Sequence, residues 1–298
     1  MELSGGVGGA RLARGLDRLD SVDLTIVVNV GDDDDIHGLH VAPDIDTVVY
    51  TLAGIEGPHG WGRSGDTFET NDEIGALGSD NTFKLGDRDL AMNILRTEAL
   101  HNGTSLSTFT SSVTKHLGVG AFVVPATDDR QRTIIETDTG EMLAFQEYFV
   151  MRQTRDTVAA VRFEGSPAPA PGVLDAITQA DVVFIAPSNP PLSIWPILAV
   201  AGVRDAVGRH NNVVAVSPLF GGKALKGPAD RVMASLGLPP GNAGVLAAYD
   251  GLLNRLIVDV SDAADIPDLD GPVSVVALET RISEARAAVS FCEKVLAL

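Results

Sequence analysis

The 298-residue chain has little cysteine, few basic residues and no long apolar run. Its single cysteine, Cys292, excludes a disulfide within the chain and a zinc site built on cysteines. No stretch of about 18 consecutive apolar residues occurs, so we expect no membrane span and no membrane partner. The opening residues MELSGG lack the basic and apolar regions of a secretory signal. A cytoplasmic location is therefore the default expectation.

Basic residues are outnumbered, with 22 Lys and Arg against 40 Asp and Glu and a formal net charge of −18. Proteins that bind DNA or RNA usually carry a basic surface, so we expect no nucleic-acid partner. A small polyphosphate remains compatible with this charge if a metal ion mediates the contact.

Short apolar runs alternate with helical stretches, which is typical of the α/β class. The runs are continuous and rich in Val and Ile, as in parallel strands that are buried on both faces of a sheet. Strands are expected at Met1–Leu3, Leu24–Asn29, Ala121–Pro125, Val182–Ala186, Val213–Ser217, Arg255–Val258 and Val273–Ala277. Helices are expected at Ala10–Leu19, Asp46–Ala53, Asp89–His101, Leu106–Leu117, Val173–Gln179, Ile194–Val207, Ala229–Leu236, Val245–Leu253 and Arg281–Ala297.

The middle of the chain has a different pattern. From about residue 127 to residue 165 apolar and polar residues alternate between turn signals such as Asp138-Thr139-Gly140. Pro167, Pro169 and Pro171 then mark a linker. We predict a Rossmann-like three-layer parallel-sheet core at 1–126 and 172–298, with a small β-rich insertion and a Pro-rich return linker at 127–171.

A glycine-rich stretch, SGGVGGAR, spans residues 4–11 before an expected helix. Glycines there let a phosphate approach backbone N–H groups at a helix N-terminus. The stretch is not a P-loop, since no Lys-Ser/Thr follows, and Arg11 breaks the G-x-G-x-x-G dinucleotide fingerprint. The alternative is a tight turn without a ligand. The preceding strand, Met1–Leu3, is either very short or continues upstream of the first residue.

Carboxylates crowd the end of the second expected strand. Asn29 is followed by the run Asp32–Asp35, and Asp44 and Asp46 lie before the next apolar run. Such charges repel one another unless solvent screens them or a hard cation such as Mg²⁺ binds them. Alternatively, the run is a solvated acidic loop, and Asp44 and Asp46 cap the helix that follows.

His37 and His40, three residues apart, could together chelate a transition metal. The many carboxylate oxygens nearby favour Mg²⁺ over Zn²⁺.

Three polar loops complete the set of candidate residues: KLGDRD at 84–89, PSNP at 187–190 and SPLFGGKALK at 217–226. In the first, Asp87 or Asp89 could cap a helix, and Arg88 could form a surface ion pair or supply a planar fork for a phosphate or ring. The other two follow strands, and open α/β sheets bind ligands outside the carboxyl ends of their strands. Lys223 and Lys226 in the third loop indicate an anion contact.

In combination these motifs resemble the 2-phospho-L-lactate transferase family of deazaflavin coenzyme (F-420) biosynthesis. The resemblance runs from Leu3 to about Asp259 through SGGVGGAR, VVNVGDD, PDIDTVVYTLAGI, GWG with DTF, LGDRDLA, FQEYFV, PSNP with SIWPIL, and SPLFGGKALKGPA. The GWG and PSNP forms look most like the actinobacterial branch, in which the transferred three-carbon unit is thought to be enolpyruvyl.

The resemblance implies an Mg²⁺-dependent transferase that is expected to form a homodimer. Its donor would be a guanosine diphospho-linked lactyl or enolpyruvyl compound. Its acceptor would be the terminal ribityl hydroxyl of 7,8-didemethyl-8-hydroxy-5-deazariboflavin, and GMP would be released.

Residue roles also follow from the resemblance. Asp46 and Arg88 are implied as the catalytic residues that contact the deazaflavin or the reacting diphosphate. The metal candidates are Asp44, Asp46 and Asp66. The residues implied in substrate binding are Asp46, Arg88, Gly5, Gly6, Asn29, Lys84, Ser188, Asn189, Gly222 and Lys223. We expect Asp46→Asn to abolish transfer and to leave the fold intact.

Two other functions compete with this interpretation. A gluconeogenesis-factor-like regulator that binds sugar nucleotides would share the glycine-rich opening but not the PDIDT and LGDRD motifs. An NAD-dependent oxidoreductase would need the complete glycine fingerprint, which is absent.

Overall fold

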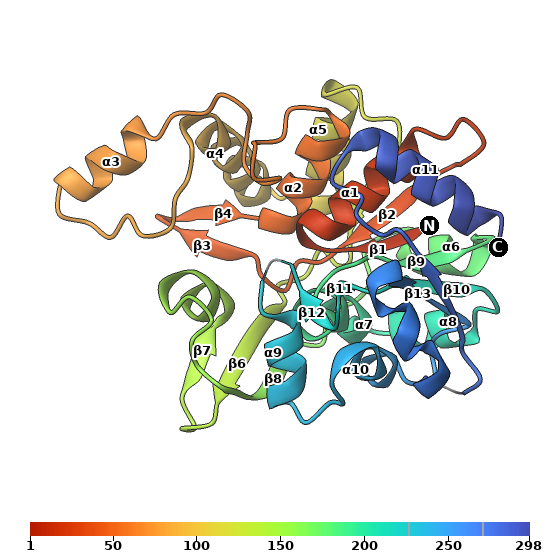
Figure 1. Ribbon diagram of the computed structural model, residues 1–298. Coiled ribbons are helices and arrows are strands. Elements are labelled where there is room, and N and C mark those ends of the chain that lie inside the picture. Colours follow the sequence, from red (N-terminus) through yellow and green to blue (C-terminus); the bar gives the residue numbers. More distant parts are fainter. Residues whose placement is uncertain (226, 270) are drawn as a thin grey trace.

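The computed structural model describes residues 1–225, 227–269 and 271–298. Its centre is a seven-stranded sheet in the order β14-β13-β10-β9-β1-β2-β5, and every neighbouring pair is parallel (Figure 1). The strands are β1 (Glu2–Ser4), β2 (Thr25–Val28), β5 (Phe122–Pro125), β9 (Val183–Ile185), β10 (Val213–Val216), β13 (Arg255–Asp259) and β14 (Ser274–Leu278).

Helices cover both faces of this sheet, and each face has its own apolar core. One layer contains α1 (Gly6–Asp17), α2 (Pro43–Leu52), α5 (Leu106–His116) and α11 (Ala285–Leu296). The other contains α6 (Val173–Gln179), α7 (Trp195–Ala199), α8 (Val203–Arg209) and α10 (Gly241–Ala248). The predicted Rossmann-like three-layer α/β fold is confirmed, because the Val- and Ile-rich strands are indeed buried on both sides.

The β-rich insertion is a separate antiparallel sheet of β6 (Arg132–Thr137), β7 (Met142–Ala144) and β8 (Val158–Glu164), in the order β7-β6-β8. A π-helical turn, Glu147–Met151, connects β7 to β8. A small apolar cluster, which includes Tyr148, packs the insertion against Leu192 and Val232 of the core. In Figure 1 the insertion lies at the lower left, apart from the main sheet. The division of the chain into domains stays a prediction.

Several elements differ from the expectation. The helix expected at Ile194–Val207 is interrupted after α7, because Gly202 adopts a left-handed conformation with φ of +77° before α8 begins. Two hairpins and a helix were not expected: β3 (Asp34–Ile36) with β4 (Leu39–Val41), β11 (Leu219–Phe220) with β12 (Lys223–Ala224), and α3 (Glu69–Ala76). The other helical elements are α4 (Asp87–His101), α9 (Ala229–Ser235), a π-helical turn at Pro190–Ile194 and a 3₁₀ helix at Val260–Asp268.

The strand order reverses at β1, which has β2 on one side and β9 on the other. The loops after β1 and β9 therefore meet at a topological switch point, where open α/β sheets bind their ligands. No helix in the described part of the chain is long and apolar enough to span a bilayer.

Candidate active site

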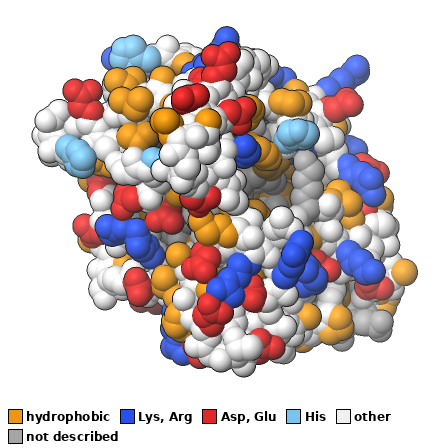
Figure 2. Space-filling model, turned by 90° about the vertical axis from the view of Figure 1, so that its left-hand side faces the viewer, with side chains coloured by type: hydrophobic (Ala, Val, Ile, Leu, Met, Phe, Trp, Pro, Cys, Tyr) orange, Lys and Arg blue, Asp and Glu red, His pale blue; other side chains and the backbone are white. Residues whose placement is uncertain are grey.

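A cavity of about 780 Å³ opens at this edge of the sheet. Its walls come from the loops after β1, β2, β9 and β10, from α2, from the segment before α4, from the insertion and from the segment after β14. In Figure 2 the hollow has hydrophobic side chains on its floor and Lys and Arg side chains at its edge. Its lining includes the predicted residues Gly5, Gly6, Asp44, Asp46, Lys84, Ser188 and Asn189.

The glycine-rich stretch allows three segments to approach one another closely. The Ser188 hydroxyl donates to the Gly5 carbonyl at 2.6 Å, and the Gly6 N–H donates to Asp44 Oδ1 at 2.7 Å. A Cβ on Gly5 would lie 2.7 Å from Asp44 Oδ2 and equally close to Ser193 Cβ. The N-terminus of α1 therefore borders the cavity, where its dipole favours an anion.

The Asn29 side chain forms hydrogen bonds with two carboxylates that line the cavity, those of Asp32 and Asp44. Its Nδ2 donates to Asp32 Oδ1 and to Asp44 Oδ2, both at 3.0 Å, and its Oδ1 accepts from the Gly31 N–H at 2.8 Å. Burial raises the pKa of Asp44 to about 6. Burial and the Asp44 charge raise the pKa of Asp32 well above its usual range. A bound cation would relieve both effects, so these two residues form the carboxylate pair best suited to one.

The other residues of the acidic run, Asp33 to Asp35, do not line the cavity. Asp34 and Asp35 begin strand β3 and pair with Arg132 at 3.1 Å and Arg130 at 2.8 Å, so two arginines balance these charges. Of the acidic run that the sequence offers as a cation site, Asp32 is the member that lines the cavity.

The two histidines do not join the cavity carboxylates. His40 Nε2 lies 3.1 Å from Asp33 Oδ2, and His37 is exposed at the β3–β4 turn. The structure therefore does not assemble a transition-metal site around this pair.

Asp46 is held by a buried arginine that the sequence argument missed. Arg96 Nη2 of α4 donates to Asp46 Oδ1, and the Arg96 side chain is 1% exposed. Arg96 Nη1 also donates to Asn93 Oδ1 at 2.8 Å. Burial raises the pKa of Asp46 while Arg96 opposes that rise. The cavity thus presents a carboxylate whose charge already has a partner.

The alternative in which Asp44 and Asp46 cap the helix that follows them is wrong. Helix α2 begins at Pro43 without a side-chain cap, and both carboxylates bond to other segments. Proline at the first helical position has no N–H to satisfy, so α2 needs one cap fewer.

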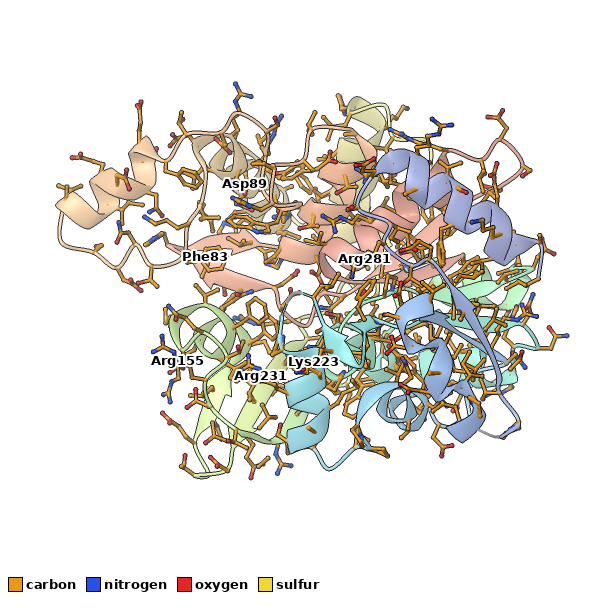
Figure 3. The ribbon with its side chains drawn as sticks, in the orientation of Figure 1. Phe83, Asp89, Arg155, Lys223, Arg231 and Arg281 are labelled. Atoms are coloured by element: carbon orange, nitrogen blue, oxygen red, sulfur yellow. The ribbon has the colours of Figure 1, made fainter. Side chains whose placement is uncertain are left out.

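Asp89, which the sequence offers as a possible helix cap, is a further cavity carboxylate beside Asp32, Asp44 and Asp46. Tyr50 Oη donates to Asp89 Oδ1 at 2.7 Å, and both residues line the cavity. Burial, together with the nearby Asp46 charge, raises the pKa of Asp89 to about 6. Figure 3 shows Asp89 at the start of α4.

Asp66, Asp87 and Arg88 form hydrogen bonds with backbone groups. Asp66 accepts from the N–H groups of Arg88 at 2.8 Å and Asp89 at 3.2 Å, and so caps α4. Asp87 accepts from the N–H of Glu69 at 3.0 Å at the start of α3. Arg88 Nη1 donates to the Ser64 carbonyl at 3.3 Å. Neither Asp66 nor Arg88 lines the cavity.

The predicted metal set of Asp44, Asp46 and Asp66 is not brought together. In the described part of the chain, no three His, Cys, Asp or Glu residues are close enough to hold one ion. Mg²⁺ commonly binds one or two carboxylates and completes its shell with waters and substrate phosphates. Asp32 and Asp44 fit that second pattern.

The glycine loop after β10 lies beside the cavity. The Gly222 N–H donates to Asp262 Oδ1 at 2.6 Å, and Lys223 is exposed on β12 (Figure 3). Their neighbours Phe220 and Leu225 line the cavity, whereas Gly222 and Lys223 do not. Lys226 lies outside the described residues.

Residues 1–269 match the family described as 2-phospho-L-lactate transferase CofD. The chain belongs to this family. Among its relatives, the phosphoenolpyruvate transferase of Streptomyces griseus is 40% identical over 313 aligned residues, which cover 99% of this chain and 98% of that protein. The 2-phospho-L-lactate transferase of Methanopyrus kandleri is 39% identical, with 99% and 95% covered.

CofD membership makes the protein a transferase of coenzyme F-420 biosynthesis, as its motifs predict. The regulator and oxidoreductase alternatives are thereby set aside. The crystal structure of a UPF0052 family protein from Bacillus halodurans is similar, with a TM-score of 0.65 at 18% identity and coverage of 99% and 98%. That likeness shows a shared fold.

Proposed function

We propose that the protein transfers a phospho-lactyl or phospho-enolpyruvyl group from a guanosine diphospho-linked donor to the ribityl hydroxyl of 7,8-didemethyl-8-hydroxy-5-deazariboflavin, with release of GMP. The observation that supports this is one cavity in which an anion-favouring helix N-terminus, buried carboxylates and aromatic walls meet. At about 780 Å³ it falls in the size range of small-molecule sites.

The donor's nucleotide would lie at the switch point between β1 and β9. Gly5 and Gly6 open the way to the N-terminus of α1, and Ser188 and Asn189 stand across from it. Backbone N–H groups and a helix dipole stabilise phosphate oxygens without requiring a basic protein surface.

The acceptor's ring would pack against the aromatic part of the lining, which contains Tyr50, Trp61, Phe83 and Phe149. Asp46 would accept a hydrogen bond from the ribityl hydroxyl and orient it toward the diphosphate, because Arg96 fixes its carboxylate at the cavity wall. Arg88 would reach the acceptor only if its bond to the Ser64 carbonyl opened.

Mg²⁺ is part of the proposal, with Asp32 and Asp44 as the residues that would hold it. Once bound, the ion would neutralise charge on the diphosphate and on the departing GMP. We also infer that the protein works in the cytoplasm as a homodimer, the commonest symmetric assembly.

The test is an incubation of the purified protein with the deazariboflavin, Mg²⁺ and each of the two guanosine-linked donors. Chromatography should show GMP and a more anionic fluorescent product in equal amounts. Omission of the acceptor or addition of a chelator should abolish both. Failure of both donors to yield GMP under these conditions would contradict the proposed reaction.

A further inference from the structure

Arg281 lines the cavity from a segment outside the residues that match the CofD family. This segment, residues 280–283, follows β14 and contributes Thr280, Arg281, Ile282 and Ser283 to the lining. Motif comparison alone would therefore overlook it.

The segment is anchored at both ends. Asp259 Oδ2 accepts from the Thr280 hydroxyl at 3.0 Å and from the Thr280 N–H at 3.2 Å. At the other end, Arg14 of α1 donates to the Ser283 carbonyl at 2.8 Å. Arg14 is about two helical turns from Gly6, so the segment lies along the helix whose N-terminus borders the cavity. Figure 3 shows Arg281 between α1 and the β11–β12 hairpin.

The Arg281 guanidinium lies near an aromatic ring and is not engaged in an ion pair within the described part of the chain. Its Cζ lies 5.4 Å from the centre of the Phe220 ring, which also lines the cavity. Among the described residues Arg281 forms no ion pair, although the chain carries 40 carboxylates. An arginine that is oriented by stacking and has no carboxylate partner keeps its planar fork available for a phosphate.

We propose that Arg281 binds the phosphate groups of the guanosine-linked donor and makes the site specific for a nucleotide over a nucleoside. This inference rests on the proposed function, because it needs a nucleoside diphosphate in the cavity. Arg281 supplies positive charge to a cavity that is also lined by Asp32 and Asp44, in a protein whose net charge of −18 repels that ligand.

The test is calorimetric binding of GDP and of guanosine to the full chain and to Arg281→Ala, Arg281→Lys and Arg286→Ala. Arg286 is the matched control because it is exposed on α11 and does not line the cavity. We expect Arg281→Ala to weaken GDP binding about tenfold and Arg281→Lys to weaken it less. Guanosine binding should be unchanged in every variant, and Arg286→Ala should match the parent for both ligands.

The possible results distinguish an error in the role of Arg281 from an error in the proposed function. If the parent chain binds GDP and Arg281→Ala binds it equally well, the role of Arg281 is wrong and the proposed function stands. An equal loss for GDP and guanosine would place Arg281 on the base and overturn the phosphate assignment. If the parent chain binds no GDP, the proposed donor class fails and the inference fails with it. Thermal unfolding of each variant checks that the fold persists.

Discussion

Asp46 and Arg96 form a buried ion pair whose members come from different helices. Removal of one member leaves the other as an unpaired buried charge, which costs about 3 kcal/mol or more. We therefore expect Asp46→Asn to abolish transfer and also to lower the unfolding temperature. The earlier expectation of an intact fold considered only the cavity side of Asp46, since Arg96 lies 50 residues away in the sequence.

Asp32→Asn is the matched comparison for stability. The Asp32 carboxylate bonds to the neutral amide of Asn29 and has Asp44 as a charged neighbour. Removal of the Asp32 charge relieves its repulsion with Asp44 and leaves no buried cation without a partner. Thermal unfolding should show Asp32→Asn at least as stable as the parent chain. Equal destabilisation by Asp32→Asn and Asp46→Asn would contradict the role given to Arg96.

The proposed Mg²⁺ site predicts that Asp32→Asn also changes the activity of the protein. In the transfer assay, Asp32→Asn should raise the Mg²⁺ concentration for half-maximal activity by at least about tenfold, because one of two protein carboxylates is lost. Asp34→Asn is the control, since Asp34 pairs with Arg132 outside the cavity. An unchanged Mg²⁺ requirement in Asp32→Asn would remove that residue from the metal site.

At the scale of elements, helix α1 depends on glycines that face other segments. A Cβ on Gly8 would lie 2.1 Å from the Pro187 carbonyl oxygen, so α1 cannot keep its position beside the β9 loop with a larger residue there. A Cβ on Gly208, in α8, would meet Leu252 Cδ2 at 3.5 Å, which is ordinary contact.

Alanine substitution at these two helical glycines should therefore have opposite effects. Gly8→Ala should lower stability by roughly 1–3 kcal/mol through overpacking. Gly208→Ala should raise it by about 0.5–1 kcal/mol, because alanine favours the helix more than glycine does. Urea unfolding measures both. A stable Gly8→Ala protein would show that the β9 loop can move away from α1.

The sequence pattern predicted the elements whose signals are local. Helix α6 has the predicted bounds, and the strands agree within one or two residues because Val- and Ile-rich runs are buried there. The reciprocal capping by Asp66 and Asp87 could not be predicted, since each carboxylate caps a helix that begins elsewhere in the chain. The break before Gly202 required knowledge of its backbone conformation.

For the whole molecule, the polar loops that follow the expected parallel strands predicted the edge of the sheet that carries the cavity. They predicted several polar residues of its lining, among them Asp44, Asp46 and Ser188, but not the contribution of Asp89 and Arg281 or the pairing of Asp46 with Arg96, which depend on contacts between distant segments. The burial of one carboxyl group, that of Glu2, also makes the stability of the whole fold depend on pH. The Glu2 side chain is completely buried in β1, and neither carboxylate oxygen has a hydrogen-bond partner among the described residues.

This buried carboxylate predicts that stability falls as pH rises. Burial raises the pKa of Glu2 from an ordinary 4.5 to about 8 in the folded protein. Between these values the folded state holds a proton that the unfolded state has released, so unfolding becomes progressively easier up to about pH 8. Asp44 and Asp89, with pKa values of about 6, add to the same trend at lower pH.

Urea unfolding of the ligand-free protein at intervals from pH 5 to pH 9, in the presence of a chelator, measures this trend. The parent chain should lose roughly a few kcal/mol of stability across the series. Glu2→Gln keeps the shape of the side chain without the titrating group, so its stability should vary much less above pH 6.5. Parallel curves for the two proteins would mean that Glu2 is ionised in the fold and has found a partner. A flatter curve for Glu2→Gln would assign the main alkaline sensitivity of the molecule to the buried carboxyl of β1, and not to the cavity carboxylates.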